Sequence, residues 1–405
     1  GRLASSYREG FFMVTQQQPM SGFRILDMTW WGVGPYCTFL CALMGAECLK
    51  IESATRGPEF LRRQARMHEL NVNKLGVTLN LKHPKTLDIV KQLVAVSDAV
   101  VENYSPGVLA RLGLGYSELR KCNPSIVLAS LSAHGATGPE SNGKGLAAIC
   151  GAVGGASFIT GYEDGPPVEL RLSADLAAGT VFCFALLSAL YHAKTRGQGL
   201  YIDGASREVM SATIGEVLMD AEVNHRDQRR LGNDRPGMAP HNVYRCAGED
   251  RWVSIAVGRQ DEWEALCEAT DKREWRTDPR FVDQTSRWLY KEELDVLLSE
   301  WARRQDAATA VETLQRKGVP ATECCNARDL LGDAHLWERG LFVHTQDEDD
   351  RAYVMTGGPW RFSQTPWNVA RRPPKMGEHN EHVFVDLLGI DRPSFEELVR
   401  QKALA

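Results

Sequence analysis

The fold is decided by the stretch from residue 23 to residue 52, which opens with Phe23-Arg24-Ile25-Leu26-Asp27 and continues through Trp31-Gly32-Val33-Gly34-Pro35. The first segment has the composition of a buried strand. The Gly/Pro-rich turn leads into an apolar helix at Tyr36–Met44, and a second strand follows at Glu47–Glu52. This order predicts a parallel sheet, with the turn at the carboxyl end of the first strand, where α/β proteins bind ligands.

The rest of the chain predicts two domains. Strand-like segments alternate with helical ones up to about residue 225, and the polar stretch 224–240 then interrupts the pattern. A hairpin pattern at Val243–Cys246 and Trp252–Val257 indicates a smaller α+β domain. We therefore expect a large α/β domain with an open parallel sheet at 22–225, a linker and small α+β domain at 226–335, and a return to the large domain at 336–405.

Composition excludes several classes of protein. The net charge of -5 over 405 residues gives no basic surface for nucleic acid. The ten cysteines form no framework spacing, so we expect reduced thiols, a cytoplasmic location and no metal site. No dinucleotide or Walker motif is present. Residues 1–12 precede Met13 without the apolar core of a signal peptide, and we expect them to be an added leader outside the fold.

Asp175 stands directly before the most apolar segment, Leu176–Tyr191. At sixteen residues the segment is shorter than the 18 or more of a bilayer span, so we expect a buried helix and no membrane partner. Asp175 has two interpretations. It is an ordinary residue at or near the N-cap, or a carboxylate kept ionised at the positive helix end, where it acts as a nucleophile.

Several motifs together resemble the class III CoA-transferase family, in family order from Phe23 to about Leu388. The matching segments are Gly34–Thr38, Gly45–Glu47, Lys50–Glu52, Val101–Gly107, Arg111–Gly113, Asn123–Pro124, Gly135–Pro139, Thr160–Gly161, Ala174–Asp175, Arg196–Gly199, Gly318–Pro320 and Gly377–His379.

The resemblance implies an interlocked, ring-like dimer, either a homodimer or a heteromer with a homologous subunit. It also implies that Asp175 attacks an acyl-CoA thioester, giving an aspartyl-acyl anhydride and then an aspartyl-CoA thioester, with no metal or redox cofactor. CoA would be bound by family-matching residues, namely Val33, Leu79, Lys82, Asn103, Tyr104, Arg111 and Lys144. A solvated surface charge is the alternative for Lys144, and closing a strand end is the alternative for Asn103.

Departures from the formyl-CoA transferases bear on the substrate. Gly32 replaces a glutamine beside the aspartate, and Leu146 and Ala147 replace a tyrosine and a glutamate of the site wall. Leu146 and Ala147, together with Trp30 and Trp31, predict an apolar wall that suits a bulky or aromatic acid, such as a benzylsuccinate-type acceptor. The expected donor is succinyl-CoA.

Arg171, four residues before Asp175, is expected to pair with a second substrate carboxylate, or else to be a salt-bridged surface residue.

Two other activities stay open at this point. The same fold houses 2-methylacyl-CoA racemases, which pair the aspartate with a histidine in a Gly-His-Asp stretch. Here that stretch is Gly143-Lys144-Gly145, and His134 lies in the preceding loop. The chain is alternatively one subunit of a hetero-oligomeric CoA-transferase.

Overall fold

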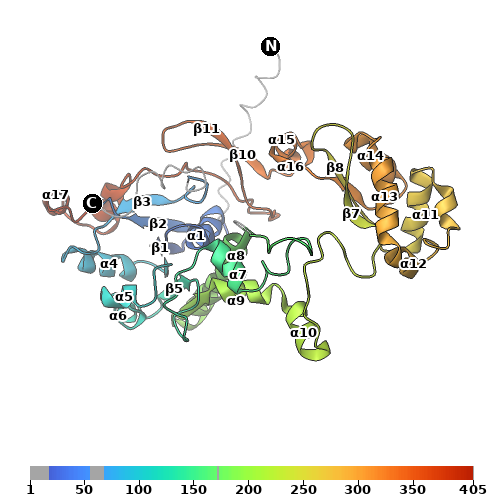
Figure 1. Cartoon of the computed structure of the whole chain (residues 1–405). Helices are drawn as coiled ribbons and strands as arrows, with labels where there is room; N and C mark the ends of the chain where they lie inside the picture. The colour runs from blue at the N-terminus through green and yellow to red at the C-terminus, as the bar shows by residue number, and fades with distance from the viewer. Residues whose placement is uncertain (1–17, 55–67, 171–172, 405) are drawn as a thin grey trace, which may run out of the picture. The chain divides into compact units, whose positions relative to one another are not determined.

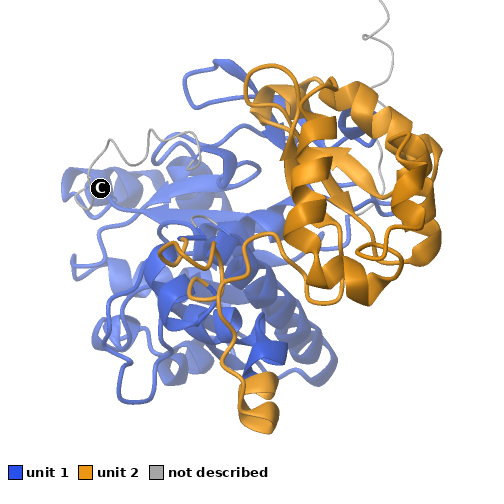
Figure 2. Ribbon diagram, turned by 45° about the vertical axis from the view of Figure 1, so that its right-hand side comes forward, with its two compact units in different colours: residues 1–156, 169–218, 335–405 blue, residues 157–168, 219–334 orange. Residues whose placement is uncertain are grey.

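The computed structural model describes residues 18–54, 68–170 and 173–404, which form two compact units (Figure 2). Unit 1 comprises the described residues of 1–156, 169–218 and 335–405, and unit 2 comprises 157–168 and 219–334. The sequence placed 157–168 in the large domain. They group with unit 2 because Gly232 donates a backbone hydrogen bond to Gly161 at 2.7 Å and Arg230 donates to the Gly165 carbonyl at 3.1 Å.

Unit 1 is built on the predicted parallel sheet, which is confirmed. Its six strands follow the order β3-β2-β1-β4-β5-β6, and every neighbouring pair is parallel (Figure 1). The strands are β1 (Arg24–Asp27), β2 (Glu47–Glu52), β3 (Leu75–Thr78), β4 (Ala99–Glu102), β5 (Val127–Ser132) and β6 (Tyr201–Ala205). The order reverses between β1 and β4, so a crevice for a ligand is expected at their carboxyl ends.

The two faces of the sheet bury separate cores, because neighbouring residues of a strand point to opposite faces. Ile25 packs with α1 (Val33–Leu43) and α8 (Ser173–Arg196), whereas Leu26 packs with α4 (Thr86–Ala95) and the C-terminal π-helix η2 (His382–Leu387). The remaining helices and strands of unit 1 are α5 (Val108–Arg111), α6 (Tyr116–Cys122), α7 (Ala147–Val153), α9 (Ser206–Ala212), the antiparallel pair β10 (Phe342–Gln346) and β11 (Ala352–Thr356), and α17 (Arg392–Arg400).

Helix α8 is longer than the sequence predicted. The apolar segment predicts a helix at Leu176–Tyr191, but the flanking polar residues belong to it: Ser173–Asp175 form the first turn and His192–Arg196 form the last. Its 24 residues are long and apolar enough to cross a membrane by length and composition, so the expectation of a helix shorter than a bilayer span was wrong. One side of the helix, with Phe182 and Leu186, is buried in the core of unit 1.

Unit 2 contains a three-stranded antiparallel sheet surrounded by helices. The sheet has the order β7-β8-β9, and the core includes Trp263, Phe281 and Leu294. Its strands and helices are β7 (His241–Arg245), β8 (Trp252–Ala256), α11 (Gln260–Ala269), η1 (Arg273–Arg276), α12 (Gln284–Leu289), α13 (Lys291–Ala302), α14 (Ala307–Arg316), β9 (Ala321–Glu323) and α15 (Ala327–Leu331). Two helices cross the boundaries between the units, α10 (Gly215–Asn224) and α16 (Ala334–Glu338).

Candidate active site

The turn between β1 and α1 has an unusual backbone. Trp31 has φ 55°, in the left-handed region that bulky residues rarely adopt. Gly32 follows as the N-cap of α1, with φ 1° and ψ -87° and no side chain to satisfy the helix end. The amino end of α1, where the positive end of its dipole lies, is therefore capped by no side chain at Gly32.

Asp175 lies against this turn. It is the third residue of α8, and its Oδ2 lies 2.0 Å from the position that a Cβ on Gly32 would occupy. One turn along α8, a Cβ on Gly179 would lie 2.9 Å from the Val33 carbonyl oxygen. Glycines thus permit α1 and α8 to approach closely, and the amino ends of both helices converge on one carboxylate. Two converging helix dipoles favour the ionised form of such a group.

Asp175 lines a cavity of about 530 Å³. Most of its lining residues come from the carboxyl ends of β1, β4 and β5 and from the loop before α7. Of the residues predicted from the sequence, it contains Trp31, Gly32, Val33, Asn103, Tyr104, Lys144, Leu146, Ala147 and Asp175. The structure therefore brings together the predicted nucleophile, most of the predicted apolar wall and one cation.

A second cavity of about 390 Å³ lies along the ends of β2 and β3. Its lining includes Trp30, Leu79 and Lys82, and Tyr104 lines both cavities. Arg111 lines neither cavity, and its Nη1 would lie 3.0 Å from a Cβ on Gly107. Arg171 lies outside the described residues.

The loop that carries Lys144 depends on its two glycines. A Cβ on Gly145 would lie 2.2 Å from the Ala133 Cβ, and one on Gly143 would lie 2.8 Å from His134 Cδ2. The loop can therefore lie directly on the end of β5 only if both flanking residues are glycine. His134 packs behind this loop and is not among the residues that line the Asp175 cavity.

Sequence reasoning missed Cys150 and Ser206 as cavity residues. Cys150 follows Leu146 by four residues, so helical spacing would have placed it on the same face of α7. Burial and the charge of Asp175 both raise the pKa of the Cys150 thiol, in agreement with their proximity. The thiol is thereby kept neutral beside the carboxylate.

A buried cluster of charged side chains, Asp27, Lys50 and Lys74, lies beside the turn between β1 and α1. Asp27 accepts hydrogen bonds from Thr38 at 2.7 Å and from Lys74 at 2.8 Å, and Lys50 lies 3.3 Å from its other oxygen. Burial opposes the ionisation of Asp27. The two lysine charges and the hydrogen bonds from Lys74 and Thr29 outweigh burial, so the pKa of Asp27 lies well below its ordinary value.

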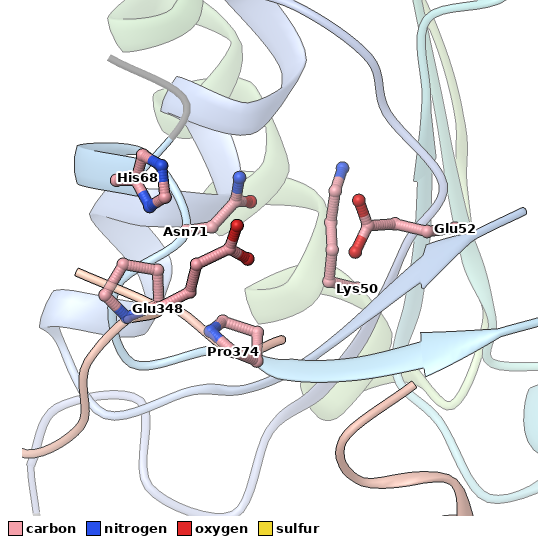
Figure 3. Close-up of a pocket in the computed structure, with 7 residues that line it drawn as sticks. Lys50, Glu52, His68, Asn71, Glu348 and Pro374 are labelled. Atoms are coloured by element: carbon pink, nitrogen blue, oxygen red, sulfur yellow. The ribbon is translucent and has the colours of Figure 1, made fainter. Parts of the chain in front are cut away.

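Lys50 and Glu52 project from β2 on one side, and the Glu52 carboxylate turns toward the Lys50 side chain (Figure 3). Burial lowers the pKa of Lys50, although the charges of Asp27 and Glu52 act in the opposite direction.

Within residues 18–54, 68–170 and 173–404, no group of three His, Cys, Asp or Glu side chains is arranged to hold a metal ion.

The family model described as CoA-transferase family III matches residues 20–380. The chain therefore belongs to this family and is a class III CoA-transferase, as the motif resemblance predicted.

Among its relatives is succinyl-CoA–D-citramalate CoA-transferase of Chloroflexus aurantiacus, which is 31% identical, with 96% of this chain and 98% of the relative covered. The succinyl-CoA–L-malate CoA-transferase beta subunit of the same organism is 29% identical, with 96% and 99% covered. A CAIB/BAIF family protein from Brucella suis has a similar structure, with a TM-score of 0.84 at 25% identity over 92% of this chain and all (100%) of that one.

Proposed function

We propose that this enzyme moves CoA from succinyl-CoA to a second carboxylic acid, with Asp175 as the nucleophile. The observation that carries the proposal is the position of Asp175. It lies where the amino ends of α1 and α8 come close together, and it lines the larger of the two cavities. The relatives whose names specify succinyl-CoA support this donor.

The reaction needs only carboxylates and thiolates. The Asp175 carboxylate attacks the thioester carbonyl carbon, and the C–S bond breaks to release CoA thiolate and leave an aspartyl-succinyl anhydride. The thiolate then attacks the aspartyl carbonyl, which releases succinate and forms an aspartyl-CoA thioester. The acceptor carboxylate repeats the first step on this thioester, and the thiolate attacks the acceptor carbonyl, which restores Asp175. Covalent catalysis divides the exchange into steps of similar energy.

CoA is proposed to lie across both cavities. Tyr104 lines both of them, and we assign its ring to stacking on the adenine. Lys82 and Lys144 supply positive charge for phosphates, one in each cavity. Arg111 is next to Leu112 in the chain, which lines the second cavity, and we propose it as a further phosphate contact.

The acceptor is proposed to be larger than formate or oxalate. Trp31, Leu146 and Ala147 give the Asp175 cavity an apolar wall, to which Ile149 also contributes. This wall favours a bulky or aromatic acid of the benzylsuccinate type, whereas the names of the two relatives specify the small dicarboxylates D-citramalate and L-malate. Both kinds share a second carboxylate, for which Arg171 is the proposed partner.

A ring-like dimer is also part of the proposal. The outer face of α8 exposes Leu176, Val181, Phe184 and Tyr191, the last two each 72% exposed. A second copy of the chain, or a homologous subunit as the beta-subunit relative suggests, would cover this apolar face. The ten free cysteines favour a reducing, cytoplasmic location.

Trapping of the intermediate tests the proposal. Hydroxylamine converts an activated carboxylate into a hydroxamate, so incubation with succinyl-CoA and hydroxylamine should modify the Asp175 peptide, as read by mass spectrometry. The controls omit succinyl-CoA or use Asp175→Asn. An unmodified Asp175 in folded protein that binds CoA would refute the nucleophile. Solvent deuterium appearing at the α-carbon of a 2-methylacyl-CoA, with no acceptor acid present, would favour racemase chemistry.

The same assay with a panel of acceptors tests the acid. Benzylsuccinate, D-citramalate, L-malate and oxalate are compared by kcat/KM. A preference for oxalate would contradict the apolar wall.

A further inference from the structure

Asn103 forms hydrogen bonds with both backbone polar groups of one residue in the turn, Trp30. Its Oδ1 accepts a hydrogen bond from the Trp30 N–H at 2.6 Å, and its Nδ2 donates to the Trp30 carbonyl oxygen. Asn103 follows directly after β4, the strand paired with β1. The neighbouring strand therefore holds the residue that precedes the left-handed Trp31 through both of its backbone polar groups.

The preceding residue is also held. Lys50 donates to the carbonyl oxygen of Thr29, and the Thr29 N–H donates to Asp27 Oδ1 at 3.0 Å. Residues 29 and 30 are thus fixed by side chains of β1, β2 and the end of β4. A bulky residue in the left-handed region costs about 1–3 kcal/mol and persists only where its surroundings determine the backbone. Here the determining contacts are on the two residues before it.

The turn fixed by these hydrogen bonds ends at Gly32, next to Asp175. Gly32 comes immediately after Trp31, and a Cβ on it would lie only 2.0 Å from Asp175 Oδ2. Any relaxation of Trp31 out of the left-handed region would move Gly32 and the amino end of α1 relative to Asp175. The direction of the carboxylate and the dipole that favours its charge therefore depend on the conformation at Trp31.

We propose that Asn103 is a positioning residue for catalysis, which locks the Trp30–Gly32 turn and thereby sets the Asp175 carboxylate for attack. The inference rests on the proposed role of Asp175. It assigns to the Asn103 side chain a function on the protein backbone in addition to any contact with CoA, because one amide N–H and one oxygen lone pair are enough for Trp30.

The two functions of Asn103 give different kinetics. A residue that only binds CoA raises KM for succinyl-CoA, or weakens CoA binding, and leaves kcat nearly unchanged. A residue that positions the nucleophile lowers kcat and leaves CoA binding nearly unchanged. Misplacement of a reacting group by about 1 Å costs about 100-fold in rate, so we expect a fall in kcat of about 10- to 100-fold.

The test uses Asn103→Asp, which keeps the acceptor for the Trp30 N–H and removes the donor to its carbonyl oxygen. Asn123→Asp is the matched control, because the Asn123 amide also holds backbone, donating to the Ser97 carbonyl oxygen at 2.8 Å and accepting from the Ser125 N–H at 3.0 Å. It lies before β5, at the amino ends of the strands, whereas the cavities lie at their carboxyl ends.

The measurements are kcat, KM, the dissociation constant of CoA, the rate of hydroxamate formation on Asp175, and the thermal midpoint. We expect Asn103→Asp to have a lower kcat and a lower rate of hydroxamate formation, with an unchanged dissociation constant of CoA. We expect Asn123→Asp to have only a lower thermal midpoint. Weaker CoA binding with normal kcat, or equal losses of kcat in both variants at matched stability, would overturn the inference. Absence of hydroxamate in the wild type would instead refute the proposed role of Asp175 as the nucleophile.

Discussion

Gly32→Ala is expected to remove most of the transfer activity and to leave the fold intact. A Cβ at residue 32 would lie 2.0 Å from Asp175 Oδ2 and 2.4 Å from its Cγ. Since real Cβ atoms essentially never approach below 3.0 Å, the contact is too short by 1.0 Å, the difference of the two values. Both atoms belong to one short side chain, so rotation about its Cα–Cβ bond can move them away without moving either helix.

The magnitude follows from that displacement. A shift of a reacting group by about 1 Å costs about 100-fold in rate, which corresponds to about 2.7 kcal/mol of barrier. The free energy of unfolding should change by less than about 1 kcal/mol, because one methyl group is added and no hydrogen bond is lost. Gly215→Ala is the matched control, since a Cβ there meets nothing within 4 Å.

The assay compares kcat, CoA binding and urea unfolding for the two alanine variants. The reasoning predicts a kcat lower by about 100-fold for Gly32→Ala only, with CoA binding and stability near the wild type. A Gly32→Ala enzyme with wild-type kcat would refute the claim that Gly32 fixes the position of the nucleophile. An unfolded Gly32→Ala protein would refute the claim that Asp175 alone absorbs the clash.

Three further predictions concern other parts of the chain. Asp175→Asn should abolish transfer and, because it removes the charge that helps to raise the pKa of Cys150, should speed alkylation of that thiol at pH 8; an unchanged rate would contradict their proximity. Lys82→Ala should weaken CoA binding about three- to tenfold, more at low salt, whereas the exposed Lys85→Ala should not. Arg287→Met should lower the unfolding free energy of unit 2 by about 3 kcal/mol or more, since the buried guanidinium donates to the carbonyl oxygens of Ala239 and Phe281 at 3.1 Å each; a stable variant would contradict this.

The sequence predicted the parallel sheet and much of the cavity for one physical reason. Parallel strands end at a common edge, so residues that follow different strands meet there. Trp31 after β1, Leu79 after β3 and Tyr104 after β4 could therefore be assigned to one region from the sequence. Helix α8 was identified from its apolar composition, although its ends were not, because polar residues can form the first and last turns of a buried helix.

The contacts that set the site could not be predicted in this way. The approach of Gly32 to Asp175 joins residues 143 positions apart, and no local pattern encodes such packing. The left-handed backbone falls on Trp31, whose residue type gives no signal for it, whereas a glycine would have. The Asn103 amide was expected to contact CoA, and its bonds to Trp30 depend on strand register.

Asp27→Asn tests whether fold stability and catalysis share the buried charge cluster. The variant keeps the shape of Asp27 and leaves Lys50 and Lys74 without a buried counter-charge, so the unfolding free energy should fall by about 3–5 kcal/mol. The pKa of Asp27 is lower in the folded protein than its ordinary value of 3.8, so its stabilisation is complete above that pH and is lost as the pH falls below it. The wild type should therefore lose its advantage over the variant in acid.

Because Lys50 loses its counter-charge and also donates to the Thr29 carbonyl oxygen, the variant should loosen the turn that precedes Gly32. We expect kcat to fall at 10 °C, under conditions where circular dichroism shows that the variant is folded. Arg287→Met provides the comparison, since it weakens unit 2 without touching this turn and should keep its kcat while folded. Equal kcat values for the two folded variants would mean that the cluster stabilises the sheet alone. A selective loss in Asp27→Asn would mean that the charges at the end of β1 hold the fold and the nucleophile through the same hydrogen bonds.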